Sequence, residues 1–139
     1  MSNAIRKMQS KFIQYLSSKN LAFQNNVEEQ ITFQYEDLNY LFVYDNSDSN
    51  YFRMLLPNIF KIEGESDVDK CKYGSIINDF NTTYKVVKAF VLTENQVWLS
   101  VEQFIYSDEH IELLFERCVM SLKATIELFY KKVNEAIRE

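Results

Sequence analysis

The 139-residue sequence contains very little glycine and proline, the two residues that most often interrupt regular secondary structure. It has two glycines, Gly64 and Gly74, and one proline, Pro57. This composition excludes a collagen-like, disordered or linker-rich chain. It also excludes a glycine-rich phosphate-binding loop, because such a loop needs several glycines close together.

Cysteine and histidine are equally scarce. Cys71 and Cys118 lie far apart in the sequence, and neither has a cysteine or histidine neighbour at zinc-ligand spacing. We expect two free thiols that pack as small hydrophobic side chains in a reducing compartment. The single histidine, His110, follows Asp108 and Glu109 in the expected first turn of a helix. We interpret it as an exposed helix-start residue, because acid–base catalysis needs a positioned partner and an enclosing pocket.

The chain also lacks an excess of positive charge and long apolar runs. Its net charge is -5, and nucleic acids and anionic lipids carry the same sign, so we expect neither a nucleic acid nor a membrane as a partner. No apolar run approaches the roughly 18 residues of a transmembrane helix. Residues 1–16 mix Arg6, Lys7 and Lys11 with apolar residues and lack the apolar core of a signal peptide. We therefore expect a cytoplasmic protein.

The stretch DNSDSN, residues 45–50, has the oxygen-rich composition of a calcium-binding loop. Such a loop needs glycine at its sixth position and glutamate at its twelfth, where this sequence has Asn50 and Leu56. A solvated turn is the better interpretation. No catalytic motif appears elsewhere, so we expect a non-enzymatic protein with no metal and no cofactor.

Hydrophobic residues make up 47% of the chain and aromatic residues 15%, which is enough to enclose one core. We therefore expect a single domain over residues 1–139. Apolar residues recur at helical spacing over residues 4–18 and 67–82 and in a long final helix that follows Ser107, Asp108 and Glu109. Ser66 and Asp69 have the spacing of a capping box at the start of the second helix.

Alternating or β-branched segments predict strands over residues 30–36, 39–45 and 51–60, and a hairpin over residues 82–92 and 95–104. Pro57 has no amide hydrogen, so the third strand should lie near a sheet edge or lose its regular pairing there. The order α-β-β-β-α-β-β-α, with short turns between strands, predicts an α+β fold with one antiparallel sheet packed against helices.

Two of the predicted strands are hydrophobic on both faces. In the second strand, Leu41 and Val43 alternate with the aromatic residues Tyr40, Phe42 and Tyr44. In the last strand, Val97, Leu99 and Val101 alternate with a set that includes Trp98 and Phe104. We expect the aliphatic sets to meet the helices, which leaves the aromatic sets exposed for a partner. The partner-binding candidates are Tyr40, Phe42, Tyr44, Trp98 and Phe104. The alternative is that a helix covers this second face as well.

Residues 75–105, SIINDFNTTYKVVKAFVLTENQVWLSVEQFI, carry a recognisable pattern. A helix ending in paired asparagines leads into a strand, a tight turn and a second strand, before a final helix that begins with acidic residues. The pattern rests on Asn78, Asn81, Lys85, Lys88, Val97 and residues 100–102. It resembles the type III secretion chaperone-like fold and, within it, the bacterial YbjN-type domains. The resemblance implies a non-enzymatic cytoplasmic protein, often dimeric, that binds an extended segment of another protein or has a regulatory role.

Two functions are consistent with this sequence. The first is a chaperone-like protein-binding module that holds a partner polypeptide, or a second copy of itself, through the aromatic sheet face. We expect a monomer only if that face is covered within the chain, and otherwise a symmetric dimer. The second is a regulatory or small-ligand-binding domain with an apolar pocket between the sheet and the long C-terminal helix.

Overall fold

The computed structural model describes residues 3–25, 29–45, 47–63 and 66–138. Within these ranges the chain forms three α-helices and six strands, and a 3₁₀ turn, η1 (Thr93–Asn95), lies inside the last hairpin. In chain order the remaining elements are α1 (Asn3–Ser18), β1 (Phe23–Asn25), β2 (Gln30–Tyr35), β3 (Leu38–Asp45), β4 (Asp48–Lys61), α2 (Asp67–Thr83), β5 (Lys88–Leu92), β6 (Gln96–Phe104) and α3 (Ile111–Arg138).

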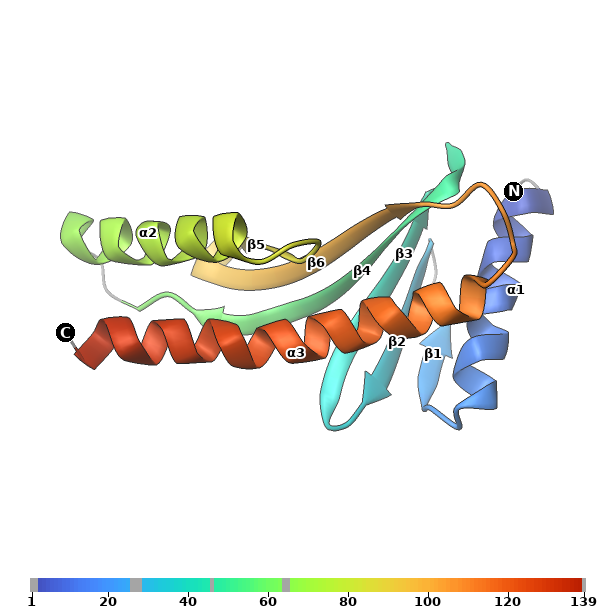
Figure 1. Ribbon diagram of the computed structural model, residues 1–139, viewed down its shortest axis with the longest axis horizontal. Helices are drawn as coiled ribbons and strands as arrows, with labels where there is room; N and C mark the ends of the chain where they lie inside the picture. Colours follow the sequence, from blue (N-terminus) through green and yellow to red (C-terminus); the bar gives the residue numbers. More distant parts are fainter. Residues whose placement is uncertain (1–2, 26–28, 46, 64–65, 139) are drawn as a thin grey trace.

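The strands form one antiparallel sheet in the order β1-β2-β3-β4-β6-β5. Helices α1 and α3 pack against one face of this sheet, and α3 runs along nearly the whole length of the molecule (Figure 1). Helix α2 packs against α3 and against the edge strand β5. The predicted α+β fold with one antiparallel sheet and three helices is confirmed, with one strand more than the sequence indicated.

The additional strand is β1, which pairs with β2 through Phe23 and Phe33 at one end and Asn25 and Ile31 at the other. All three β1 residues are exposed. A strand this short, with no buried face, leaves no alternating pattern in the sequence. Its formation depends on the neighbouring strand, so it could not be predicted locally.

The helix boundaries agree closely with the expected ones. The Ser66 side chain caps α2 by accepting a hydrogen bond from the Asp69 backbone N–H at 3.1 Å, and its hydroxyl donates to the Asp69 carboxylate. Helix α3 contains 28 residues, and its predicted apolar stripe lies in the core or packs against it. His110 does not lie in the first turn of α3: it precedes the helix in the left-handed region, with φ 60°. In the first helical stripe, the side chain of Ile5 lies outside the described residues.

The turn between β3 and β4 has the predicted polar character, but it is shorter than the turn expected over residues 45–50, because β3 extends to Asp45 and β4 begins at Asp48. The Asp45 carboxylate accepts hydrogen bonds from the backbone N–H and the hydroxyl of Ser47, and the Asp48 carboxylate accepts from the Asn50 N–H at 2.9 Å. The two bonds from Ser47 lower the pKa of the Asp45 carboxyl. Short side chains that bond to nearby backbone amides are typical of turns.

Pro57 interrupts the sheet in its middle. Strand β4 lies between β3 and β6, so the predicted edge position is wrong. The alternative, an end to regular pairing, is confirmed: the β3–β4 register ends at Leu41 and Leu55, and the β4–β6 register shifts between Leu56 and Phe60. Because proline has no N–H to donate, β4 separates from β3 at this point, and the two strands diverge below their hairpin (Figure 1).

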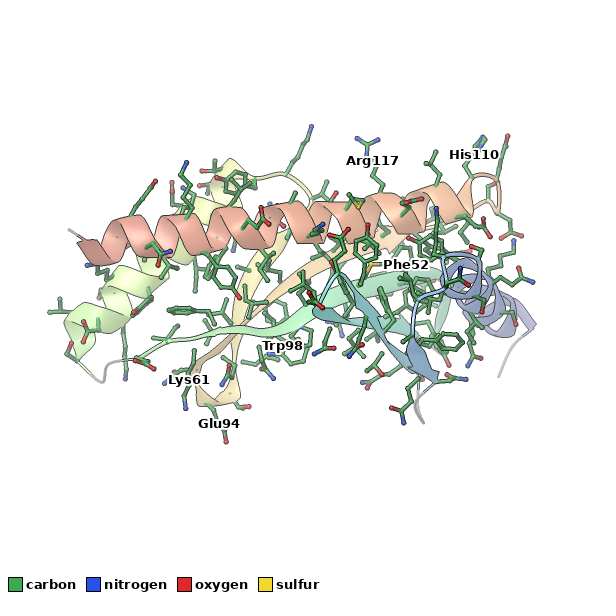
Figure 2. The ribbon with its side chains drawn as sticks, turned by 90° about the horizontal axis from the view of Figure 1, so that it is seen from below. Phe52, Lys61, Glu94, Trp98, His110 and Arg117 are labelled. Carbon is green, nitrogen blue, oxygen red and sulfur yellow. The ribbon has the colours of Figure 1, made fainter. Side chains whose placement is uncertain are left out.

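Aromatic rings fill the space between the sheet and the helices. The Phe12 ring of α1 stacks on the Phe42 ring of β3 with centroids 3.9 Å apart, and the Phe115 ring of α3 contacts both edge-on. Phe52 of β4 lies between the sheet and α3 and joins the same group (Figure 2). Edge-on aromatic pairs of this kind add stabilisation beyond that of area burial alone.

The predicted exposure of Tyr40, Phe42 and Tyr44 is wrong, because all three side chains lie in the core under α1 and α3. The strand pairing gives the reason. Phe42 pairs with Met54, and Met54 pairs with Val101, so the aromatic set of β3 shares a face with the aliphatic set of β6. The alternation in each strand was correct, but the choice of buried register in β3 was reversed.

Burial leaves the Tyr40 hydroxyl without a hydrogen-bond partner among the described residues. The Tyr40 ring stacks on Phe33, and burial raises the pKa of its hydroxyl well above the ordinary value. An unpaired buried hydroxyl costs about 1 to 3 kcal/mol. We therefore expect Tyr40→Phe to raise the free energy of unfolding by about 1 kcal/mol or more in urea melts. A loss of stability would show that the hydroxyl is paired in solution.

Candidate functional site

Two of the five candidate partner-binding residues, Trp98 and Phe104, lie on the sheet face that α1 and α3 leave open. Their neighbours in β6, Val97, Leu99 and Val101, point into the core. The buried register predicted for this strand is confirmed. Figure 2 shows Trp98 on the side of the sheet away from α3.

Phe104 belongs to a group of three rings, which we call the 104 cluster: the exposed Phe104 and Tyr106 and the partly buried Tyr51. Phe104 pairs with Tyr51 across the β4–β6 ladder, with ring centroids 5.8 Å apart, and stacks on Tyr106 at 6.3 Å. Phe104 is 62% exposed and Tyr106 is 81% exposed. Burial, with a smaller contribution from Glu102, raises the pKa of Tyr51 to about 12. The Tyr51 hydroxyl is therefore uncharged at neutral pH.

Trp98 has a structural role as well as a partly exposed ring. Its indole N–H donates to the Asn58 side-chain oxygen at 2.9 Å, and its ring contacts Phe90 of β5. Asn58 lies in the interrupted part of β4, with φ 52°. On the α3 side, the Tyr130 hydroxyl donates to the Ile59 carbonyl at 2.6 Å. Trp98 of β6 and Tyr130 of α3 thus both donate hydrogen bonds to the irregular segment of β4 that follows Pro57.

The middle of the open face separates Trp98 from the 104 cluster. Arg53 of β4 pairs in register with Val43 of β3 and Glu102 of β6, so the aliphatic and charged residues of three strands lie side by side. Leu55 is only 3% exposed although it points to this open side. The open face therefore carries two separate aromatic groups, with aliphatic and charged residues between them, rather than one continuous aromatic surface.

Asn81, one of the two asparagines in the sequence pattern, covers part of one edge of the sheet. The Asn81 side chain accepts from the Ala89 N–H at 2.7 Å and donates to the Ala89 carbonyl at 3.0 Å, as a neighbouring strand would. The Lys88 ammonium donates to the Asn81 and Tyr84 carbonyls at the end of α2. These contacts protect part of the β5 edge from pairing with another chain. The pattern behind the family resemblance therefore has a structural function here.

The cysteines and the histidine form no common site. Both cysteines are free thiols, as predicted, but the expectation that both are packed is wrong for Cys71, which is exposed. Burial raises the pKa of the Cys118 thiol to about 11. Among the described residues, no group of three or more His, Cys, Asp or Glu side chains is placed to hold a metal ion. None of the helices in the described ranges has the length and apolar character needed to cross a membrane.

A groove of about 500 Å³ lies on the open face at the opposite end of the sheet from β5. Its lining comes from β1, β2 and β3 and includes Pro57 of β4. The ligand pocket expected from the sequence was to lie between the sheet and α3. That space holds the fully buried rings of Phe12, Phe42, Phe52, Phe115 and Phe129.

Comparisons with known proteins complete the description of the fold. A scan against protein-family models found no match, and a search of curated proteins found none either. Among solved structures, the chain is similar to the crystal structure of YbjN from E. coli, a proposed transcription regulator. The two share 12% sequence identity and superpose with a TM-score of 0.58 over 85% of this chain and 87% of the other. At this identity the similarity concerns the fold alone: the chain has a YbjN-type fold.

Proposed function

We propose that this protein is a non-enzymatic protein-binding module whose contact surface is the open face of the sheet, centred on the 104 cluster. The observation that carries the proposal is the exposure of Phe104 and Tyr106, at 62% and 81%, next to Tyr51. Aromatic side chains are enriched in the centres of protein interfaces, where they contribute large contact areas.

The surroundings of the cluster suit a protein partner. Arg53 and Glu102 lie next to it on the same face and offer both signs of charge at its rim. An apolar centre with a polar rim is the usual composition of an interface. The net charge of -5 argues against nucleic acid as the partner, so we do not extend the regulatory description of YbjN to direct contact with DNA.

The partner is a second polypeptide or a second copy of this chain. A chaperone-like role, in which the open face holds an extended segment of another protein, follows from the resemblance of residues 75–105 to type III secretion chaperone-like domains. Self-association is favoured by the exposed rings, because the condition for a monomer, a fully covered aromatic face, is not met at Phe104 and Tyr106. A self-complementary patch closes most simply about a twofold axis.

The second candidate function, a regulatory domain with an apolar ligand pocket under α3, has less support. The described rings in that region make close stacked and edge-on contacts, as between Phe12 and Phe42 or Phe80 and Phe129. A ligand there would have to displace core side chains at a cost of several kcal/mol.

Sedimentation velocity over a micromolar concentration series tests self-association. We expect the wild-type chain to shift from monomer to dimer, and Phe104→Ser/Tyr106→Ser to raise the dissociation constant about 30-fold or more, equivalent to roughly 2 kcal/mol. Leu113→Ser is the matched control, because Leu113 is 66% exposed on α3, the helix that covers the other face of the sheet. A wild-type chain that stays monomeric throughout would remove self-association and leave only a foreign partner.

A further inference from the structure

The groove on the open face arises from the separation of β3 and β4. The last β3–β4 pair is Leu41 and Leu55, and beyond it β3 continues through Tyr40 and Asn39, which have no partner in the β3–β4 register. Pro57 lies on the other side of this fork and lines the same groove. A short stretch of the β3 edge is thus open in the interior of the sheet rather than at its margin.

The described residues that line the groove bring together five uncharged hydrogen-bonding side chains from three adjacent strands: Gln24, Gln30, Thr32, Gln34 and Asn39. Leu41 and Pro57 supply apolar surface between them. Gln34 donates from its amide nitrogen to the Asn39 side-chain oxygen at 3.0 Å, which leaves the other half of each amide for a ligand. The volume, about 500 Å³, is within the range of ligand sites.

We propose that this fork groove binds a short, uncharged, extended peptide segment whose backbone pairs with β3 at Asn39. The proposal rests on the proposed function and adds a second contact surface to it, separate from the 104 cluster. The described lining holds no charged side chain, although charged residues make up 25% of the chain. A charged ligand would therefore meet no opposite charge among the described residues of the groove.

The chemistry of the groove favours a peptide over other neutral ligands. Each glutamine and asparagine side chain presents one donor group and one acceptor group, as a peptide bond does. An open strand edge adds main-chain hydrogen bonds that only another extended backbone can match along its length. Leu41 and Pro57 can contact the small apolar side chains of such a segment.

NMR titration of the ¹⁵N-labelled full chain tests the proposal with defined probes. The first probe is a blocked pentapeptide of alternating threonine and valine, and the second is the same peptide with lysine in place of threonine. The third probe, maltotriose, is a neutral carbohydrate. We expect the neutral peptide to shift the side-chain amides of Gln34 and Asn39 saturably, with a dissociation constant about tenfold lower than that of the lysine peptide.

A charge variant assigns the binding to the groove. Gln34→Glu should weaken binding of the neutral peptide by about tenfold, because it places a negative charge in the groove and removes the amide N–H that bonds to the Asn39 side-chain oxygen. Gln14→Glu, the same change on the exposed side of α1, should leave binding unaltered. Equal loss in both variants would point to net charge rather than to the groove and would overturn the proposal.

Three other results would also overturn it: no saturable shift with the neutral peptide at millimolar concentration, tighter binding of the lysine peptide, or preferential binding of maltotriose at the same amides. If the groove fails this test while Phe104→Ser still weakens association, the proposed function stands without it. If the groove binds the peptide and Phe104→Ser has no effect on association, the 104 cluster fails instead.

Discussion

Phe42→Ala should lower the free energy of unfolding by about 3 to 5 kcal/mol, the range for truncation of a fully buried phenylalanine. Phe42 is 0% exposed and contacts rings from both covering helices, Phe12 of α1 and Phe115 of α3, as well as Phe52 of β4. Its removal leaves a cavity that three elements border. Urea denaturation followed by circular dichroism measures the change.

The neighbouring residue supplies the control. Val43 points to the open face and is only partly buried, so Val43→Ala should cost about 1 kcal/mol or less. If Val43→Ala were instead the more destabilising change, the buried register of β3 would be the aliphatic one. The assignment of its faces in the structure would then be contradicted.

Leu99→Ala should lower the free energy of unfolding by about 2 to 5 kcal/mol, because Leu99 is fully buried in the core. Trp98→Ala should cost less, since the ring is only partly buried and its main losses are one hydrogen bond to Asn58 and the contact with Phe90. Paired denaturant melts of the two variants decide between them.

Trp98→Phe separates the two contributions of the tryptophan, because it keeps a ring beside Phe90 and removes the N–H that Asn58 accepts from. Its expected cost is about 1 kcal/mol, the value of a single hydrogen bond. Should Trp98→Ala prove more destabilising than Leu99→Ala, both faces of β6 would be core, and Trp98 would be lost as an interface residue.

The sequence pattern was sufficient to predict the buried face of an element where the residues of that element alone distinguish its two faces. The stripe of α3 and the alternation of β6 were both predicted correctly: polar positions mark the exposed side of α3, and the open register of β6 holds Ser100 and Glu102 beside its aromatic residues. In β3 both registers are hydrophobic, so alternation alone could not say which faces the helices. That choice depends on the pairing of Phe42 with Met54 and of Met54 with Val101, which no local pattern records.

The candidate site was predictable only in part, for the same reason. Phe104 and Trp98 were found from alternation, and Tyr106 continues the register of Phe104, which is a signal the sequence does contain. Tyr51 joins the 104 cluster only through strand pairing. The fork groove was not foreseeable, because Pro57 indicated a break in pairing but not which strands would separate around it.

The central claim, that the open face around Phe104 binds a protein, is tested most directly by parallel affinity capture. Immobilised wild-type chain, Phe104→Ser and Leu113→Ser are incubated with extract of the source cells, and the retained proteins are quantified by mass spectrometry. The account predicts a partner, or the chain itself, retained equally by wild type and Leu113→Ser and reduced about tenfold or more with Phe104→Ser. Identical retention by all three chains would contradict it.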